Sequence, residues 1–350
     1  MWVFENVGKE RIQSLDGLRA ISIIAVTVSH YVSRMLPLPS RRLMGPLGSM
    51  GVDVFFVISG FLITSLMLRE LDRHGRISVT GFYRRRALRI FPAYLFFLFF
   101  VFLLGRFALL PVANKEWPYL LTYTYNLKPH QVFASIGQVW SLCVEEHFYL
   151  LWPFTLVVLG VRRSPIVLWL SIVVAMVLRF WLFLSNNSAF DPTFFSPTRL
   201  DTIAVGCLLA FAFRNPWIQR VRGERLVVCS GLLFFASNYL FLSGKYELGP
   251  KHFIDASAVA VIIACLTQDA SGPIGRLLNW RPVVWIGVLS YSIYLAQTIV
   301  IADLLPFALR IPAALLYACI SYYLIESPFL KLKDRAKAPA REAAQTAASS

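Results

Sequence analysis

The chain has 350 residues, of which 57% are hydrophobic, 15% aromatic and 15% charged, and its mean hydropathy is +0.62. This composition excludes an ordinary soluble domain, which contains a smaller share of apolar residues, and it predicts a polytopic membrane protein. The formal net charge of +15 comes mostly from basic residues beside the apolar segments, so it does not indicate nucleic-acid binding.

Ten apolar segments predict an all-α fold, a membrane helical bundle of about ten transmembrane helices in residues 15–330. Residues 1–14 are expected to form a cytoplasmic N-terminal segment without a signal peptide. Residues 331–350 are expected to form a basic, disordered cytoplasmic tail. The expected spans are Leu15–Leu36, Gly48–Leu68, Leu88–Leu110, Val139–Val161, Pro165–Leu184, Leu200–Phe213, Leu226–Leu242, Phe253–Leu266, Val283–Leu304 and Phe307–Ile325.

The distribution of Lys and Arg predicts the orientation. With the N-terminus in the cytoplasm, 22 of the 34 basic residues fall in cytoplasmic segments, seven of them between Arg69 and Arg89. The positive-inside rule therefore predicts that both termini are cytoplasmic. We expect a multi-pass protein of the inner cell membrane, surrounded by membrane lipids.

No metal site is expected. The five cysteines all fall inside expected spans and are interpreted as packing residues, and no histidines show metal-ligand spacing. These cysteines are Cys143, Cys207, Cys229, Cys265 and Cys319.

The first expected span contains two ionisable residues, Arg19 and His30. Eleven residues bring an α-helix within about 20° of three whole turns, so both side chains share one face about 16 Å apart. An ionisable group inside the hydrocarbon region is costly unless it faces a cavity or a partner. This face is therefore predicted to be functional.

Four polar side chains from four spans are expected in one layer of the outer half of the membrane. At 1.5 Å per residue, His30 and Glu145 lie about 9 Å and Asp53 about 7 Å below the external face, with Gln297 at a similar level. A histidine near carboxylates gains basicity and a defined tautomer. Such residues also serve as structural clamps between helices, and Glu146 and His147 are given a packing role by default.

A second cluster of charge lies where the third span begins. Arg86 and Arg89 are one helical turn apart, with Arg84 and Arg85 beside them. Guanidinium groups at this spacing form a fork for phosphate. The alternative is positive-inside anchoring and contact with lipid headgroups.

Six sequence strings together resemble the membrane-bound acyltransferase-3 family. The resemblance covers Leu15 to about Leu330. The strings are Leu15-Asp-Gly-Leu-Arg-Ala through His30, Gly51-Val-Asp-Val-Phe-Phe-Val-Ile-Ser-Gly-Phe-Leu-Ile, Arg85-Arg-Ala-Leu-Arg-Ile-Phe-Pro-Ala-Tyr, Trp140-Ser-Leu-Cys-Val-Glu-Glu-His-Phe-Tyr-Leu-Leu-Trp-Pro, Arg199-Leu-Asp and Ser290-Tyr-Ser-Ile-Tyr-Leu.

The resemblance implies an integral-membrane enzyme that moves an acyl group, usually acetyl, from cytoplasmic acyl-CoA to a hydroxyl of an extracytoplasmic carbohydrate or glycolipid. In this interpretation Arg86 and Arg89, with Arg19, bind the phosphates of coenzyme A. His30 acts as general base or transient acyl carrier, and Glu145 or Asp53 orients and polarises it. Residues expected to bind or orient the substrate are Trp140, Ser141, Asp201 and Gln297.

One position departs from the family pattern. Gln297 stands where many members have a histidine, and an amide cannot carry a proton near neutral pH. A scheme with two histidines is therefore excluded here. Because no appended hydrolase-like domain is expected, the membrane part must pass the acyl group to the acceptor itself or to a separate partner protein. The expected protein partner is such an extracytoplasmic acyl-transfer protein or a second copy of the chain in a homo-oligomer.

A transporter or flippase for a sugar-containing or anionic substrate is the alternative function. The same buried histidine and carboxylates would then relay protons or bind a sugar. The sequence contains no inverted repeat and no matched pair of broken helices, which favours the enzyme.

Overall fold

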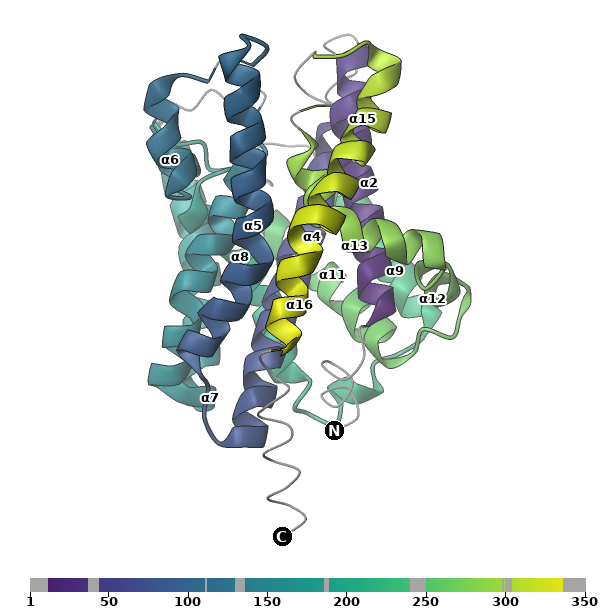
Figure 1. Ribbon diagram of the computed structural model, residues 1–350. Helices are drawn as coiled ribbons and strands as arrows, with labels where there is room; N and C mark the ends of the chain where they lie inside the picture. The colour runs from purple at the N-terminus through teal and green to yellow at the C-terminus, as the bar shows by residue number, and fades with distance from the viewer. Residues whose placement is uncertain are drawn as a thin grey trace. The chain divides into compact units, whose positions relative to one another are not determined.

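The computed structural model describes residues 12–36, 44–110, 112–129, 136–185, 189–239, 250–297, 299 and 304–335. Within these residues the regular structure is helical and contains no strand, so the predicted all-α fold is confirmed (Figure 1). The α-helices are α2 (Gln13–Met35), α4 (Gly45–His74), α5 (Val79–Arg106), α6 (Trp117–Leu121), α7 (Val139–Leu184), α8 (Ser196–Ala212), α9 (Glu224–Tyr239), α11 (Lys251–Gln268), α12 (Pro273–Leu278), α13 (Arg281–Leu295), α15 (Phe307–Ile320) and α16 (Ser327–Arg335), with a π-helix at Ser321–Glu326.

Six helices in the described part of the chain are long and apolar enough to cross a membrane. The 46 residues of α7 form two helices that meet at Gly160, whose φ of 69° and ψ of 177° are not helical, and these two helices correspond to expected spans four and five. The sixth is the shorter apolar helix Leu200–Ala212. Expected spans seven and nine continue, beyond α9 and α13, into residues outside the described part. The six candidate spans are Gln13–Ser33, Gly45–His74, Val79–Arg106, Val139–Leu184, Lys251–Gln268 and Phe307–Leu332.

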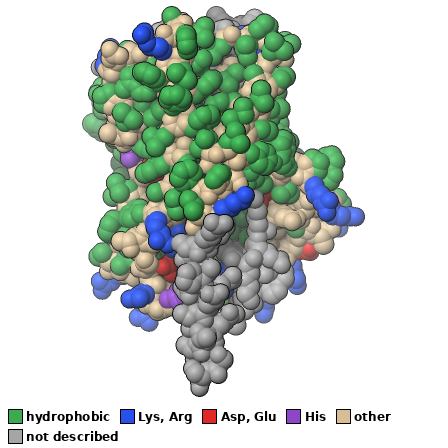
Figure 2. All heavy atoms as spheres, viewed as in Figure 1, with side chains coloured by type: hydrophobic (Ala, Val, Ile, Leu, Met, Phe, Trp, Pro, Cys, Tyr) green, Lys and Arg blue, Asp and Glu red, His purple; other side chains and the backbone are tan. Residues whose placement is uncertain are grey.

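The surface of these helices is strongly apolar. Phe99 is 56%, Val158 76% and Leu324 68% exposed, and hydrophobic side chains cover most of the face drawn in Figure 2. A soluble monomer rarely exposes contiguous apolar area on this scale, whereas a bilayer requires it. The surface thus agrees with an integral membrane protein.

The chain divides into two compact units, and the first comprises Met1–Ile77 and Lys115–Ser290. Its helices α4 and α8 pack through glycines. A Cβ at Gly60 would lie 2.1 Å from the carbonyl oxygen of Ile203, and one at Gly206 would lie 2.1 Å from that of Val57. Small residues allow this close backbone approach between membrane helices.

The second unit comprises Ser78–Asn114 and Tyr291–Ser350. Helix α5 begins after Ser78, whose Oγ accepts a hydrogen bond from the backbone nitrogen of Gly81 at 3.1 Å, as an N-cap does. The hydroxyl of Tyr291 donates to the carbonyl oxygen of Ile90 in α5 at 3.2 Å. Helix α16 extends into the expected tail as far as Arg335; residues 1–11 and 336–350 lie outside the described residues.

The predicted orientation can be tested with two exposed positions in a cysteine-free background. Asn114→Cys, in a loop predicted to face outward, is expected to react with an impermeant maleimide in intact cells. Ser78→Cys, between α4 and α5, is expected to react only after the cells are opened. The measurement is the labelled fraction of each variant, and labelling of Ser78→Cys from outside would reverse the orientation.

Candidate active site

Helix α2 places Arg19 and His30 in one unbroken helix, as predicted. Between them on the same face lie Ile23 and Val26, each 1% exposed. The side chain of Arg19 is 16% exposed, and its Nη1 lies 3.4 Å from Oδ1 of Asp16. His30 is half-buried.

The opposite side of α2 is the exposed one. Ile21, Ile24 and Val28 are 48%, 45% and 38% exposed, and at 100° per residue they lie about 140–200° around the helix from Arg19. Lipid-facing surface therefore lies away from the two ionisable side chains. The prediction is that Arg19 and His30 share a face of α2 that is turned toward protein. The exposure of the opposite face agrees with this prediction.

Glu145, in the first turns of α7, is held by two hydroxyl groups. Ser59 of α4 donates to Oε1 at 2.8 Å, and Tyr149 donates to Oε2 at 3.2 Å. The hydroxyl of Tyr149 also lies 2.9 Å from Oγ of Ser59. These contacts fix the orientation of the carboxylate and connect α4 to α7.

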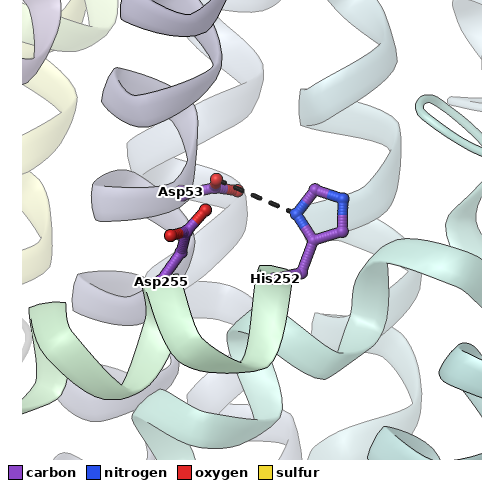
Figure 3. A group of neighbouring side chains, drawn as sticks. All are labelled: Asp53, His252 and Asp255. Atoms are coloured by element: carbon purple, nitrogen blue, oxygen red, sulfur yellow. Dashed lines mark ion pairs between the residues drawn. The ribbon is translucent and has the colours of Figure 1, made fainter. Parts of the chain in front are cut away.

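Asp53 belongs to a buried ionic cluster whose members come from α4, α8 and α11. Figure 3 shows Asp53 with two of these members, His252 and Asp255. Its Oδ1 accepts a hydrogen bond from Nη2 of Arg199 at 2.5 Å. Nη1 of Arg199 lies 2.6 Å from Nδ1 of His252, and that ring nitrogen is 3.9 Å from Oδ2 of Asp53. Asp255 extends from the same helix as His252 toward Asp53, and Lys251 donates to its Oδ2 at 2.9 Å.

The ligand atoms of Asp53, His252 and Asp255 lie within 4.8 Å of one another, a spacing that a metal ion could bridge. However, Arg199 and Lys251 already supply two positive charges to the two carboxylates. A divalent cation would have to displace a guanidinium from the site and would face like charge at short range. The donor set therefore favours an internal clamp over a metal centre.

Asp201 forms a second buried ion pair. Its Oδ2 accepts from Nη2 of Arg179 at 2.7 Å, and the side chains are 0% and 2% exposed. Its Oδ1 accepts from the backbone nitrogen of Thr202 at 2.8 Å. Both oxygens thus have structural partners, and a contact between Asp201 and substrate remains a prediction.

Trp140 lies in the first turn of α7, beside Arg199 of the buried ionic cluster. Its ring is 5.8 Å from the guanidinium carbon of Arg199 and 5.1 Å from the ring of Phe194. Trp140 is half-buried, so part of the indole remains accessible. The adjacent Ser141 is buried, and its hydroxyl donates to the carbonyl oxygen of Gln138 at 3.3 Å.

Tyr125, in the loop before α7, is only 3% exposed. Burial, with a smaller contribution from the charge of Glu116, raises the pKa of Tyr125 to about 12. Its phenol therefore stays neutral and is covered by protein, so Tyr125 offers little surface to a substrate.

The remaining predicted residues lie in the second unit. Arg86 and Arg89 are both half-buried in α5, one turn apart as predicted. The guanidinium carbon of Arg86 lies 5.9 Å from the ring centroid of Phe82. Gln297, after α13, is 0% exposed. A phosphate site that joins these arginines to Arg19 remains a prediction.

Sequence reasoning assigned no role to Arg199, His252 or Asp255, which surround Asp53. One signal was present, because Asp255 is an ionisable residue within the expected span Phe253–Leu266 and therefore needs a partner. The side chains that gather around Asp53 come from helices far apart in the sequence, so the local sequence pattern did not indicate which residues meet.

The family model described as an acyltransferase domain matches residues 12–325. The chain is similar to the O-acetyltransferase OatA of Staphylococcus aureus (28% identical, 91% of this chain and 57% of the relative). It is similar to the putative peptidoglycan O-acetyltransferase YrhL of Bacillus subtilis (29% identical, 91% and 54%). The chain spans about half the length of these relatives, and no solved structure matches it. The match across nearly all the described helices shows that the chain belongs to the acyltransferase-3 family.

Proposed function

We propose that the chain is an O-acyltransferase of the inner cell membrane that moves an acetyl group from cytoplasmic acetyl-CoA to a hydroxyl of an extracytoplasmic carbohydrate or glycolipid. The observation that carries this proposal is the half-buried imidazole of His30 on the protein-facing side of a membrane helix. Family membership and the O-acetyltransferase names of the relatives support the reaction class.

His30 is the proposed general base or transient acyl carrier. Both roles use an imidazole whose ring nitrogen can accept a proton or an acyl group. Of the two carboxylates proposed to orient it, Asp53 already pairs with the positive charge of Arg199. That charge weakens the field that Asp53 exerts on a second group, so Glu145 is the better candidate.

The donor site is proposed to include Arg86 and Arg89, with Arg19 as a further phosphate ligand. We expect Arg86→Ala and Arg89→Ala each to weaken acetyl-CoA binding by roughly ten-fold, because a charge-assisted contact to phosphate is worth about 1.5–3 kcal/mol. Lysine at either position should rescue binding only partly, since it cannot form the bidentate fork.

The measurement is the dissociation constant of acetyl-CoA for purified protein in detergent at fixed salt. Arg84→Ala is the matched control, because Arg84 belongs to the same helix but is exposed. Equal affinity in all three alanine variants would assign the arginine cluster to membrane topology alone.

The function is tested by supplying radiolabelled acetyl-CoA to proteoliposomes that contain the protein and a glycan acceptor. Transfer of label to the acceptor, with release of coenzyme A, is expected. Movement of the glycan across the membrane without thioester cleavage would support transport instead. Mass spectrometry of surface glycans, peptidoglycan included, from a deletion strain would then identify the acceptor as the species that loses acetyl groups.

A further inference from the structure

A serine and a histidine outside the proposed site lie within hydrogen-bonding distance. Oγ of Ser196, the first residue of α8, is 2.7 Å from Nδ1 of His147 in α7. Ser196 is 4% exposed, and His147 is half-buried. A serine hydroxyl that donates to a histidine nitrogen is the arrangement that activates a nucleophile.

The histidine of this pair is oriented by a third group. The imidazole also forms a hydrogen bond with the backbone of Tyr123. Tyr123 has a φ of 55°, one of two non-glycine residues with positive φ in the described chain. Non-glycine residues adopt this conformation at a cost, and such residues are concentrated at functional sites. Nucleophile, base and orienting group are thus all present.

Asn126 completes the surroundings of the serine. Its Nδ2 donates to Oγ of Ser196 at 2.7 Å and to the carbonyl oxygen of Phe194 at 3.0 Å. Asn126 is 2% exposed, yet its Oδ1 has no hydrogen-bond partner among the described residues. A buried acceptor without a partner is costly unless a ligand completes it, and an incoming hydroxyl group has the matching donor.

Two further features suit an acyl group at this position. Ser196 begins a helix of 17 residues, and the positive end of a helix stabilises negative charge that develops on oxygen. The ring of Phe194, two residues earlier, contacts the ring of Trp140 at 5.1 Å. Trp140 is a residue predicted to orient the acceptor, so the serine lies beside the proposed acceptor site.

We propose that Ser196 and His147 form a second catalytic pair, in which Ser196 accepts an acyl group from an activated acyl ester or thioester and holds it as an ester. The orienting group is the backbone of Tyr123, and Asn126 receives the hydroxyl that later attacks. The place of the Ser196–His147 pair in the reaction rests on the proposed function. In that reaction His30 serves the donor half-reaction, and Ser196 holds the acyl group for the acceptor.

The chemistry of each step is balanced. Oγ of Ser196 forms a bond to the acyl carbon while the bond from that carbon to its leaving group breaks. The Oγ proton passes to His147 and then to the leaving group. In the second step the acceptor hydroxyl attacks the ester carbon and gives its proton to His147, which returns it to Oγ as the serine leaves.

The test uses the purified full chain in detergent and a fluorophosphonate, which reacts covalently with activated serines. The parent is expected to be labelled at Ser196, as located by mass spectrometry of its peptides. His147→Gln, which keeps a hydrogen-bonding side chain but removes the base, should lower the labelling rate by about 100-fold or more. Ser257→Ala is the matched control, because Oγ of Ser257 donates to the backbone oxygen of Phe253 in its own helix and its loss should leave labelling unchanged.

Ser196→Ala should abolish labelling and transfer to the acceptor, and Ser196→Thr provides a variant that keeps the hydroxyl if the alanine variant is poorly folded. An unlabelled Ser196 in the folded parent, or equal labelling rates in the parent and His147→Gln, would overturn the proposal. Labelling needs no acetyl-CoA, so these outcomes are independent of the radiolabelled transfer assay. Failure of that assay in the parent would overturn the proposed function and leave the labelling result standing.

Discussion

His30→Gln is expected to remove acetyl transfer, with a loss of at least about 100-fold in rate, while the protein still inserts in the membrane and binds acetyl-CoA. Glutamine retains a hydrogen-bonding side chain but cannot exchange a proton or carry an acyl group near neutral pH. The proposed phosphate ligand nearest along α2 is Arg19, about 16 Å away, so donor binding should survive.

The measurement is the transfer rate of His30→Gln at matched protein level, beside the dissociation constant of acetyl-CoA. If His30 only ties helices together, the glutamine variant should keep most of its activity and lose stability instead. Activity within a few-fold of the parent would therefore end the assignment of His30 to the chemistry. Ser33→Ala is the matched control, because its Oγ bonds the backbone of Ser29 on the same helix.

Arg199→Met is expected to destabilise the protein strongly. Removing one partner of a buried ion pair leaves an uncompensated charge, at a cost of about 3–5 kcal/mol. The side chains of Arg199 and Asp53 are 1% and 0% exposed, so water cannot compensate the loss. Adding Asp53→Asn to Arg199→Met should recover much of the stability, because the amide needs no counter-charge.

Thermal unfolding in detergent, followed by gel filtration of the heated sample, compares these variants. Arg214→Met is the control, since Arg214 pairs with Asp72 at 2.6 Å but both side chains are exposed, and such a pair contributes at most about 1 kcal/mol. The interpretation of the cluster as a clamp is wrong if Arg199→Met has the same melting temperature as the parent. It is also wrong if the double variant has a melting temperature no higher than that of Arg199→Met.

The sequence alone determined the helices and the residues that share a helix. Apolar runs predicted the membrane segments, since a bilayer satisfies backbone hydrogen bonds only within a helix or a closed barrel. Helical periodicity placed Arg19 and His30 on one face, and the burial of Ile23 and Val26 agrees with it. The turn of helix between Arg86 and Arg89 follows from the same local geometry.

Only the tertiary structure decided which side chains from different helices meet. Asp53 reaches Arg199, 146 residues away, and Ser196 reaches His147, 49 residues away and assigned a packing role from sequence. Apolar helices of similar composition form their own backbone hydrogen bonds equally well, so those bonds do not decide how the helices rotate or which helices pair. Rotation and pairing depend on close glycine contacts, such as that of Gly60 with Ile203, and on the need of each buried charge for a partner.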